Sequence, residues 1–231
     1  MLVLKINYTK HLDRARKSVR YHAFRSREVP GEQRGIFDRD KDHADVAAFI
    51  RSLDDPLTRP RETKNRTIHY AVMHRLIFSL SRQEFDSCGL TSWKPVIREA
   101  LGAVERYHGI RLEWVAAEHQ SRTHPHVHVD IKSVVTGPDV HPRRLRITQE
   151  MRQHLRLAVE GILKRERERV RAERAQERAI QREMDRFVDS LTQSLLRTLN
   201  RAAREDEHFD PLLPRRRRRS PEERKRDDRE R

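Results

Sequence analysis

Apolar and polar residues alternate along several stretches of the chain, and the clearest alternation covers residues 126–131. The two phases are Val127, Val129 and Ile131 against His126, His128 and Asp130. Because successive side chains of a β-strand point to opposite faces, this pattern predicts a strand with one buried face and one polar face. It also predicts that His126 and His128 are near neighbours on the polar face.

Three further strands are predicted at residues 2–7, 73–80 and 110–118, which are rich in branched apolar side chains. Only a short loop separates the last of these from the histidine strand, which favours an antiparallel hairpin. Hairpin geometry would bring His119, at the end of the earlier strand, back towards His126 and His128. Three imidazoles are therefore expected to converge.

Helical patterns occupy most of the remaining chain. A basic helix is predicted from Thr9, which can cap it, to Pro30-Gly31, and an amphipathic helix from Ser92 to His108, ended by Gly109. Residues 44–53 predict a short helix, and residues 148–207 predict one or two long helices of alternating charge. The predicted fold class is α+β, a central antiparallel sheet with helices on one face, followed by long C-terminal helices and a disordered basic tail.

Composition narrows the class of partner. The 231 residues include 51 Lys and Arg against 36 Asp and Glu, a net charge of +15, which suits a partner that carries phosphates. No apolar run approaches the ~18 residues of a membrane span, and the N-terminus does not resemble a signal peptide. The single cysteine excludes an intrachain disulfide framework, so a cytoplasmic protein is expected.

The predicted basic helix carries the residues expected to bind a nucleic acid. These are Arg14, Arg16, Lys17, Arg20, Arg25 and Arg27. Tyr21 lies among them, and its chemistry allows two interpretations. It is either an aromatic residue at the edge of the core or a phenol held near cations and a phosphodiester, which makes a candidate nucleophile. The five arginines at residues 215–219 suggest a further polyanion contact, against the alternative of a merely solubilising tail.

The histidines favour a metal site. Neutral imidazoles are good ligands for transition metals, and two on one strand face with a third nearby can surround one ion. The alternative is a solvated polar face in a chain that holds 13 histidines. Four histidines within ten residues, in strand phase, favour the metal site.

The order of these features resembles the relaxase (mobilization nuclease) family of the HUH endonuclease superfamily. The resemblance covers roughly residues 1–160 and depends on His126-Val127-His128 with His119 before them, and less specifically on the tyrosine region. It implies a ferredoxin-like nuclease domain at residues 1–147, a charged helical extension at 148–208 and a tail at 209–231.

Relaxases nick one DNA strand at an origin of transfer. The resemblance implies that Tyr21, or Tyr8 as the second choice, attacks the scissile phosphate to give a 5′-phosphotyrosine. It implies that His119, His126 and His128 bind a divalent metal ion (Mg, Mn or Zn). It also implies single-stranded origin DNA, accessory relaxosome proteins and a type IV secretion coupling protein as partners, in a bacterial cytoplasm.

One position departs from the family pattern. The family usually has an aspartate two residues after the first histidine, where this chain has Ser121. Glu118 or Asp130 could substitute for that carboxylate, and His124 is expected to support the ligands from outside.

Three alternatives follow from the same residues. A rolling-circle replication initiator would use the same chemistry on another origin. A metallo-β-lactamase-like hydrolase would require Asp-His after the three alternating histidines, and Val129-Asp130 does not match it. A non-catalytic nucleic-acid-binding protein with a degenerate metal site stays an alternative because the aspartate is missing at Ser121.

Overall fold

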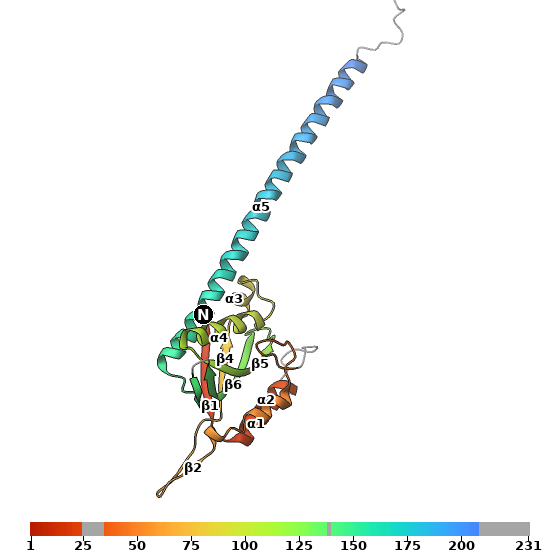
Figure 1. Ribbon diagram of the computed structural model, residues 1–231. Coiled ribbons are helices and arrows are strands. Elements are labelled where there is room, and N and C mark those ends of the chain that lie inside the picture. Colours follow the sequence, from red (N-terminus) through yellow and green to blue (C-terminus); the bar gives the residue numbers. More distant parts are fainter. Residues whose placement is uncertain (25–34, 138–139, 208–231) are drawn as a thin grey trace, which may run out of the picture. The chain divides into compact units, whose positions relative to one another are not determined.

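The computed structural model describes residues 1–24, 35–137 and 140–207 (Figure 1). The strands are β1 (Val3–Thr9), β2 (Arg61–Glu62), β3 (Thr67–Ile68), β4 (Met73–Ser79), β5 (Arg111–His119), β6 (His126–Gly137) and β7 (Val140–Arg144). The helices are α1 (Leu12–Phe24), α2 (Val46–Ser52), α3 (Arg82–Ser87), α4 (Lys94–His108) and α5 (Gln149–Glu207), with a 3₁₀ turn at Pro56–Thr58.

The central sheet is antiparallel throughout, in the order β1-β4-β6-β5, and β7 pairs with the far end of β6. The predicted α+β class and the antiparallel sheet are confirmed. The predicted hairpin is also present, since β5 and β6 pair from Arg111 opposite Thr136 to His119 opposite His126. Strands β2 and β3 form a separate two-stranded ribbon.

Helices cover both faces of the sheet, which corrects the prediction of helices on one face. Helices α3, α4 and the first part of α5 pack in one core with the apolar phase of β6. Helices α1 and α2 pack in a second core with Met73 of β4 and with Val115 and Ala117 of β5. Ala117 is opposite His128 in the register, so the second core shares its face of the sheet with the histidines.

Local signals explain the ends of two helices. Gly109 ends α4 in the left-handed conformation at φ 60°, as its position predicted. Helix α3, which was not predicted, begins with a capping box between Ser81 and Glu84. The sequence motif S-x-x-E is visible there, but six residues give too short a periodic pattern for prediction.

Residues 1–174 form one compact unit, so the first part of α5 belongs to the folded domain rather than to an extension beginning at residue 148. Buried side chains of α5 explain this difference, because Leu155, Val159 and Ile162 lie in the core beside α4. A second unit begins at Ala175, and its described residues continue α5 as one helix to Glu207. The predicted tail at 209–231 lies outside the described residues. None of the helices in the described segments has the length and apolar character to cross a membrane.

Candidate metal centre

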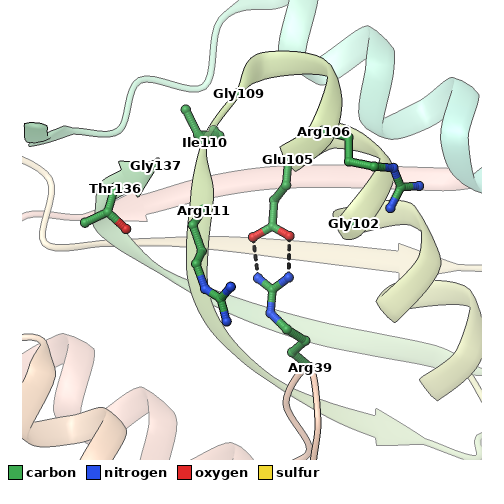
Figure 2. Close-up of a pocket in the computed structure, with 9 residues that line it drawn as sticks. All are labelled: Arg39, Gly102, Glu105, Arg106, Gly109, Ile110, Arg111, Thr136 and Gly137. Carbon is green, nitrogen blue, oxygen red and sulfur yellow. Dashed lines mark hydrogen bonds and ion pairs between the residues drawn. The ribbon is translucent and has the colours of Figure 1, made fainter. Parts of the chain in front are cut away.

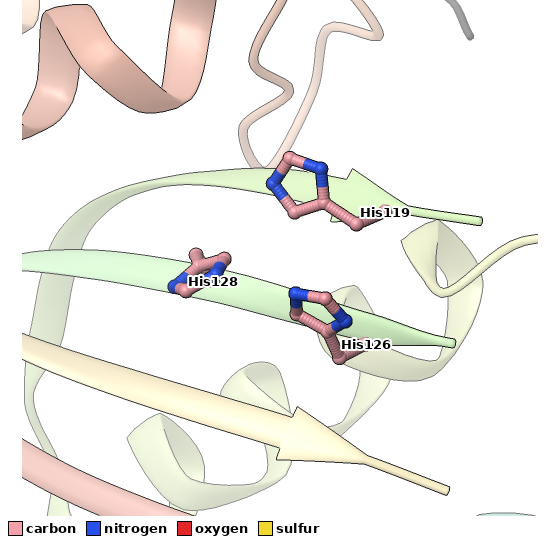
Figure 3. Close-up of side chains that lie close together, drawn as sticks. All are labelled: His119, His126 and His128. Atoms are coloured by element: carbon pink, nitrogen blue, oxygen red, sulfur yellow. The ribbon is translucent and has the colours of Figure 1, made fainter. Parts of the chain in front are cut away.

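Three imidazoles converge at the loop end of the β5–β6 hairpin, where His119 ends β5 and His126 begins β6. His119 projects from β5, and His126 and His128 project from the adjacent strand β6 (Figure 3). Their ring centroids are 5.1, 5.1 and 5.3 Å apart, and one ligand nitrogen from each ring lies within 4.8 Å of the others. His119 is 2% exposed, whereas His126 and His128 are half-buried, so the cluster keeps an accessible side.

Strand register accounts for this convergence. His119 pairs directly with His126, and His128 lies two residues along the same face of β6. Cross-strand neighbours on one face have Cβ atoms about 5 Å apart. Strand pairing alone therefore brings the three histidines together, and no special loop conformation is needed.

The β5–β6 loop orients His126. Its Nδ1 lies 3.0 Å from the carbonyl oxygen of His124, and because a carbonyl only accepts, Nδ1 donates and Nε2 keeps its lone pair. The support expected of His124 thus comes from its backbone, and its ring is exposed. Ser121, at the departing position, accepts weak hydrogen bonds from the amides of Thr123 and His124 and so orders the loop.

His128 has the state that a metal ligand requires. Burial, followed by the neighbouring His22, lowers its pKa to about 2, so the ring is neutral at pH 7. Among the residues that the structure describes, none hydrogen-bonds to its buried Nδ1. Three converging imidazoles with an open side fit a transition-metal ion, which would complete its coordination with oxygen ligands.

A buried polar chain connects the histidine cluster to α1, and its central residue was not predicted from the sequence. The His22 ring stacks on His128 at 4.4 Å, and its Nδ1 donates to Asp130 Oδ2 at 2.8 Å. Asp130 also accepts from Arg75 of β4 at 3.4 Å, and Arg75 donates to Ser18, one turn before His22. Asp130, proposed as a substitute carboxylate, therefore contacts His22 rather than a triad histidine.

The position of His22 on α1 is the feature of the sequence that could have indicated its buried role. The buried positions of α1 are Ala15, Val19, His22 and Ala23, which form a core-facing stripe. A histidine in such a stripe needs a hydrogen-bonding partner on the sheet beneath it. That partner cannot be read from sequence spacing, because His22 and Asp130 are 108 residues apart.

Tyr21 lies next to His22 near the end of α1. Its side chain is 55% exposed, and its ring meets the His22 ring edge-on at 6.1 Å. Arg14, Lys17 and Arg20 are exposed on the same helix. Arg16 is partly buried, 4.0 Å from Asp54, and the predicted DNA-binding residues Arg25 and Arg27 lie outside the described segments.

Two candidate site residues, Tyr8 and Glu118, lie on the sheet face opposite the histidine triad. Tyr8 pairs with His74, which pairs with Ile131, so its side chain belongs to the sheet face opposite His128. Glu118 also points to that face, where its carboxylate accepts from the amide of Trp93 and the hydroxyl of Ser92. Glu118 thus holds the start of α4 and does not replace the aspartate of the family.

A cavity of about 570 Å³ lies beside the end of α4, away from the triad (Figure 2). Its central feature is a two-point ion pair between Arg39 and the buried Glu105, with an Nη1–Oε2 distance of 2.6 Å. Glu105 also accepts from the amide of Leu112 at 2.6 Å. The pair satisfies its own charges and joins the 35–39 segment to α4 and β5, which is a structural role.

Comparison with solved structures finds the conjugative relaxase TrwC. TrwC in complex with oriT DNA, in its metal-bound structure, is 14% identical with a TM-score of 0.48, and the match covers 74% of this chain and 70% of that chain. TrwC with a 27-mer DNA comprising the recognition hairpin and the cleavage site is 12% identical, with a TM-score of 0.46 and coverages of 74% and 69%. No family model and no curated protein matches the sequence.

Proposed function

We propose that this protein nicks and rejoins a single DNA strand at an origin of transfer, in the manner of a relaxase. One observation carries the proposal. A three-histidine cluster with an open side lies under the helix that carries Tyr21, and His22 of that helix stacks on His128. The cluster and the candidate nucleophile are therefore held together by neighbouring residues of one helix.

His119, His126 and His128 would hold a divalent metal ion. When bound, such an ion supplies Lewis-acid stabilisation of the negative charge on the scissile phosphate. The half-buried rings of His126 and His128 leave that side accessible to a phosphate. The hydrogen bond to the carbonyl of His124 fixes the orientation of His126.

Tyr21 would provide the nucleophile. Its phenolic oxygen forms a bond to phosphorus as the bond from phosphorus to the 3′ oxygen breaks, which leaves a 5′-phosphotyrosine and a free 3′-OH. The proton lost by the phenol is balanced by the proton gained at the 3′ oxygen. The phosphodiester bond energy stays in the adduct, so rejoining needs no nucleotide cofactor.

The exposed face of α1 would hold the strand beside the nucleophile. Arg14, Lys17 and Arg20 offer three cations along it, and Tyr21 and Phe24 are exposed in the last turn that follows them. Cations next to exposed aromatic rings suit a single strand, because unstacked bases can lie against the rings. Accessory relaxosome proteins and a type IV coupling protein stay predictions from the sequence resemblance.

A test combines the full chain with Mn²⁺ or Mg²⁺ and labelled single-stranded oligonucleotides that contain a randomised core. The expected result is a protein–DNA adduct that survives denaturation and is abolished by EDTA and by His126→Ala. His124→Ala is the matched control, because it removes an exposed ring and keeps the carbonyl that orients His126. An adduct that forms equally in EDTA and in His126→Ala would refute the metal-assisted reaction.

A further inference from the structure

A second cavity lies on the sheet face opposite the histidines and has no part in the proposed nicking. Its volume is about 640 Å³, within the range of ligand-binding pockets. It is formed where the end of β1, the segment before β4, the end of β7 and the start of α5 meet. All of these segments belong to the compact unit of residues 1–174.

The charge of this cavity is entirely positive. Lys10, Arg144, Arg146 and Arg152 line it, and no Asp or Glu is among its lining residues. Within the described parts of the chain, no carboxylate comes within the 4.0 Å of an ion pair to any of these four cations. By contrast, Arg39 in the cavity beside α4 is paired with Glu105, and Lys132 in a neighbouring cavity is paired with Asp55. Four cations without counter-charges in one cavity indicate an anionic ligand.

Aromatic rings lie among these cations. The guanidinium of Arg144 lies 3.8 Å from the ring centroid of Tyr70, and Lys10 lies 5.9 Å from that of Tyr8. Tyr8 is 61% exposed although it is a large ring on a sheet strand. The floor is His74, whose Nδ1 lies 2.8 Å from the Ser133 hydroxyl and whose pKa burial lowers to about 4. The floor is therefore neutral at pH 7.

This chemistry selects among ligands. A metal ion would need carboxylates or several accessible histidines, and an apolar ligand would not need four cations. A ligand with phosphates and planar bases uses both features, since the cations contact phosphates and an exposed tyrosine stacks on a base. The bases of a duplex are already stacked on each other, so only an unpaired strand can use the ring of Tyr8.

We propose that the cavity lined by Tyr8, Tyr70, Lys10, Arg144, Arg146 and Arg152 binds a segment of single-stranded nucleic acid, separately from the histidine site. The choice of DNA for that strand rests on the proposed function, whereas the recognition of bases and phosphates rests on the cavity alone. A relaxase that held one strand at two sites would retain the DNA on the sheet face opposite the nick.

Photo-crosslinking locates the contact directly. The experiment uses the full chain with His126→Ala, so that binding is measured without nicking. This chain is irradiated with a 12-nucleotide single strand that contains 5-iododeoxyuridine. The expected crosslinked peptides contain Tyr8 or Tyr70. Crosslinks confined to other peptides, including α1, would overturn the proposal and leave the nicking function untouched.

Binding measurements supply the second test. In the same His126→Ala background, Tyr8→Leu is combined with Arg144→Gln and Arg152→Gln. This cavity variant is expected to bind oligo-dT at least ~10-fold more weakly. The slope of log K against log salt should decrease by about 1.4, because two phosphate contacts are lost. The matched control removes an exposed tyrosine and two exposed arginines elsewhere, in Tyr107→Leu with Arg106→Gln and Arg171→Gln, and should change affinity far less.

Two outcomes would overturn the proposal, and a third would overturn only its choice of DNA. Equal losses of affinity in the cavity variant and the control would show that the net charge of the chain, and not this cavity, determines binding. Binding of dTMP as tight as that of the oligonucleotide would assign the cavity to a free nucleotide. Tighter binding of oligo-rU than of oligo-dT would replace DNA by RNA. Should the cavity variant fail to fold, the crosslinked peptides of the His126→Ala chain decide the matter.

Discussion

At the scale of single residues, His22 is the side chain that joins the two halves of the candidate site. It is buried, stacks on His128, and donates to Asp130, which Arg75 also contacts. Its neighbour Tyr21 is exposed, with its ring edge-on to the His22 ring. Two consecutive residues of α1 thus have different environments, one packed against the histidine cluster and one accessible to a substrate.

Replacing His22 tests this connection. His22→Phe keeps a ring on His128 and removes the donor to Asp130, so a buried carboxylate loses a hydrogen bond. The expected cost is about 1–3 kcal/mol in the free energy of unfolding, measured in urea. Tyr21→Phe alters an exposed neighbour and should stay within ~0.5 kcal/mol. Equal stability of both variants would mean that the His22–Asp130 contact is not maintained in solution.

The triad could be predicted from the sequence, and its surroundings could not. Alternation by two puts His126 and His128 on one face, and a short hairpin loop brings His119 to them. Which candidate tyrosine shares that face depends on the register of β1 against β4, which places Tyr8 on the other side. Register is set by tertiary packing, so the tyrosines could not be separated by spacing alone.

At the scale of elements, α1 joins the second core to an exposed basic surface. Its small buried residues pack close to the sheet, and Arg14, Lys17 and Arg20 face outward. The covering of both sheet faces was missed, although β5 carried a signal. Residues 114–117 are buried in both phases, and such a continuous apolar run is typical of a strand covered on two sides.

Neutralising the α1 surface should change the salt dependence of DNA binding. With Arg14, Lys17 and Arg20 changed to Gln, the slope of log K against log salt for single-stranded DNA should decrease by about 2, since each lost phosphate contact contributes ~0.7. The slope is measured by fluorescence anisotropy at salt concentrations from roughly 50 to 300 mM, over which electrostatic screening changes strongly. Arg106, Arg111 and Arg171 changed to Gln form the control, and an equal decrease there would refute a specific role for α1.

His74 of β4 should make stability depend on pH. Burial lowers its pKa from 6.5 to about 4, so below pH 6.5 the unfolded chain binds a proton that the folded chain does not. The contribution of His74 to the free energy of unfolding is complete above pH 6.5 and decreases by about 3 kcal/mol as the pH falls to about 4.

Urea unfolding from pH 7.5 to pH 4.5 measures this effect. His74→Phe should show a shallower decrease than the unchanged chain, whatever its stability at pH 7. The exposed His69, changed to Phe, should retain the full slope. Identical slopes in the His74 and His69 variants would show that His74 accepts a proton while folded.

At the scale of the whole molecule, charge and the long helix were predictable and the domain boundary was not. The chain has a net charge of +15, and α5 is one helix from Gln149 to Glu207 where the sequence predicted one or two. The boundary at residue 174 was not predictable, because the apolar side chains in this part of α5 are spaced widely among charges. That sparse stripe, which includes Leu155, Val159 and Ile162, is buried only because the sheet and α4 lie beneath it.

Metal binding should stabilise the folded unit. The three histidines meet only in the folded state, so Mn²⁺ or Zn²⁺ at 100 times its Kd should add about 2.7 kcal/mol and raise Tm by roughly 5–10 °C. Differential scanning calorimetry with and without the metal measures the shift. His126→Ala should abolish it and His124→Ala should keep it. A shift that survives in His126→Ala would assign the metal to other residues.

The most direct test of the account is to identify the residue that becomes attached to DNA. Trypsin digestion of the denatured adduct and fragmentation of the peptide spanning residues 21–25 would locate the modification. The account predicts a 5′-phosphate on Tyr21 that is stable in acid and absent from Tyr21→Phe. A modification on Tyr8, or an acid-labile one on His22, would contradict the assignment of the nucleophile. The absence of any adduct with every metal and oligonucleotide tried would contradict the nicking function itself.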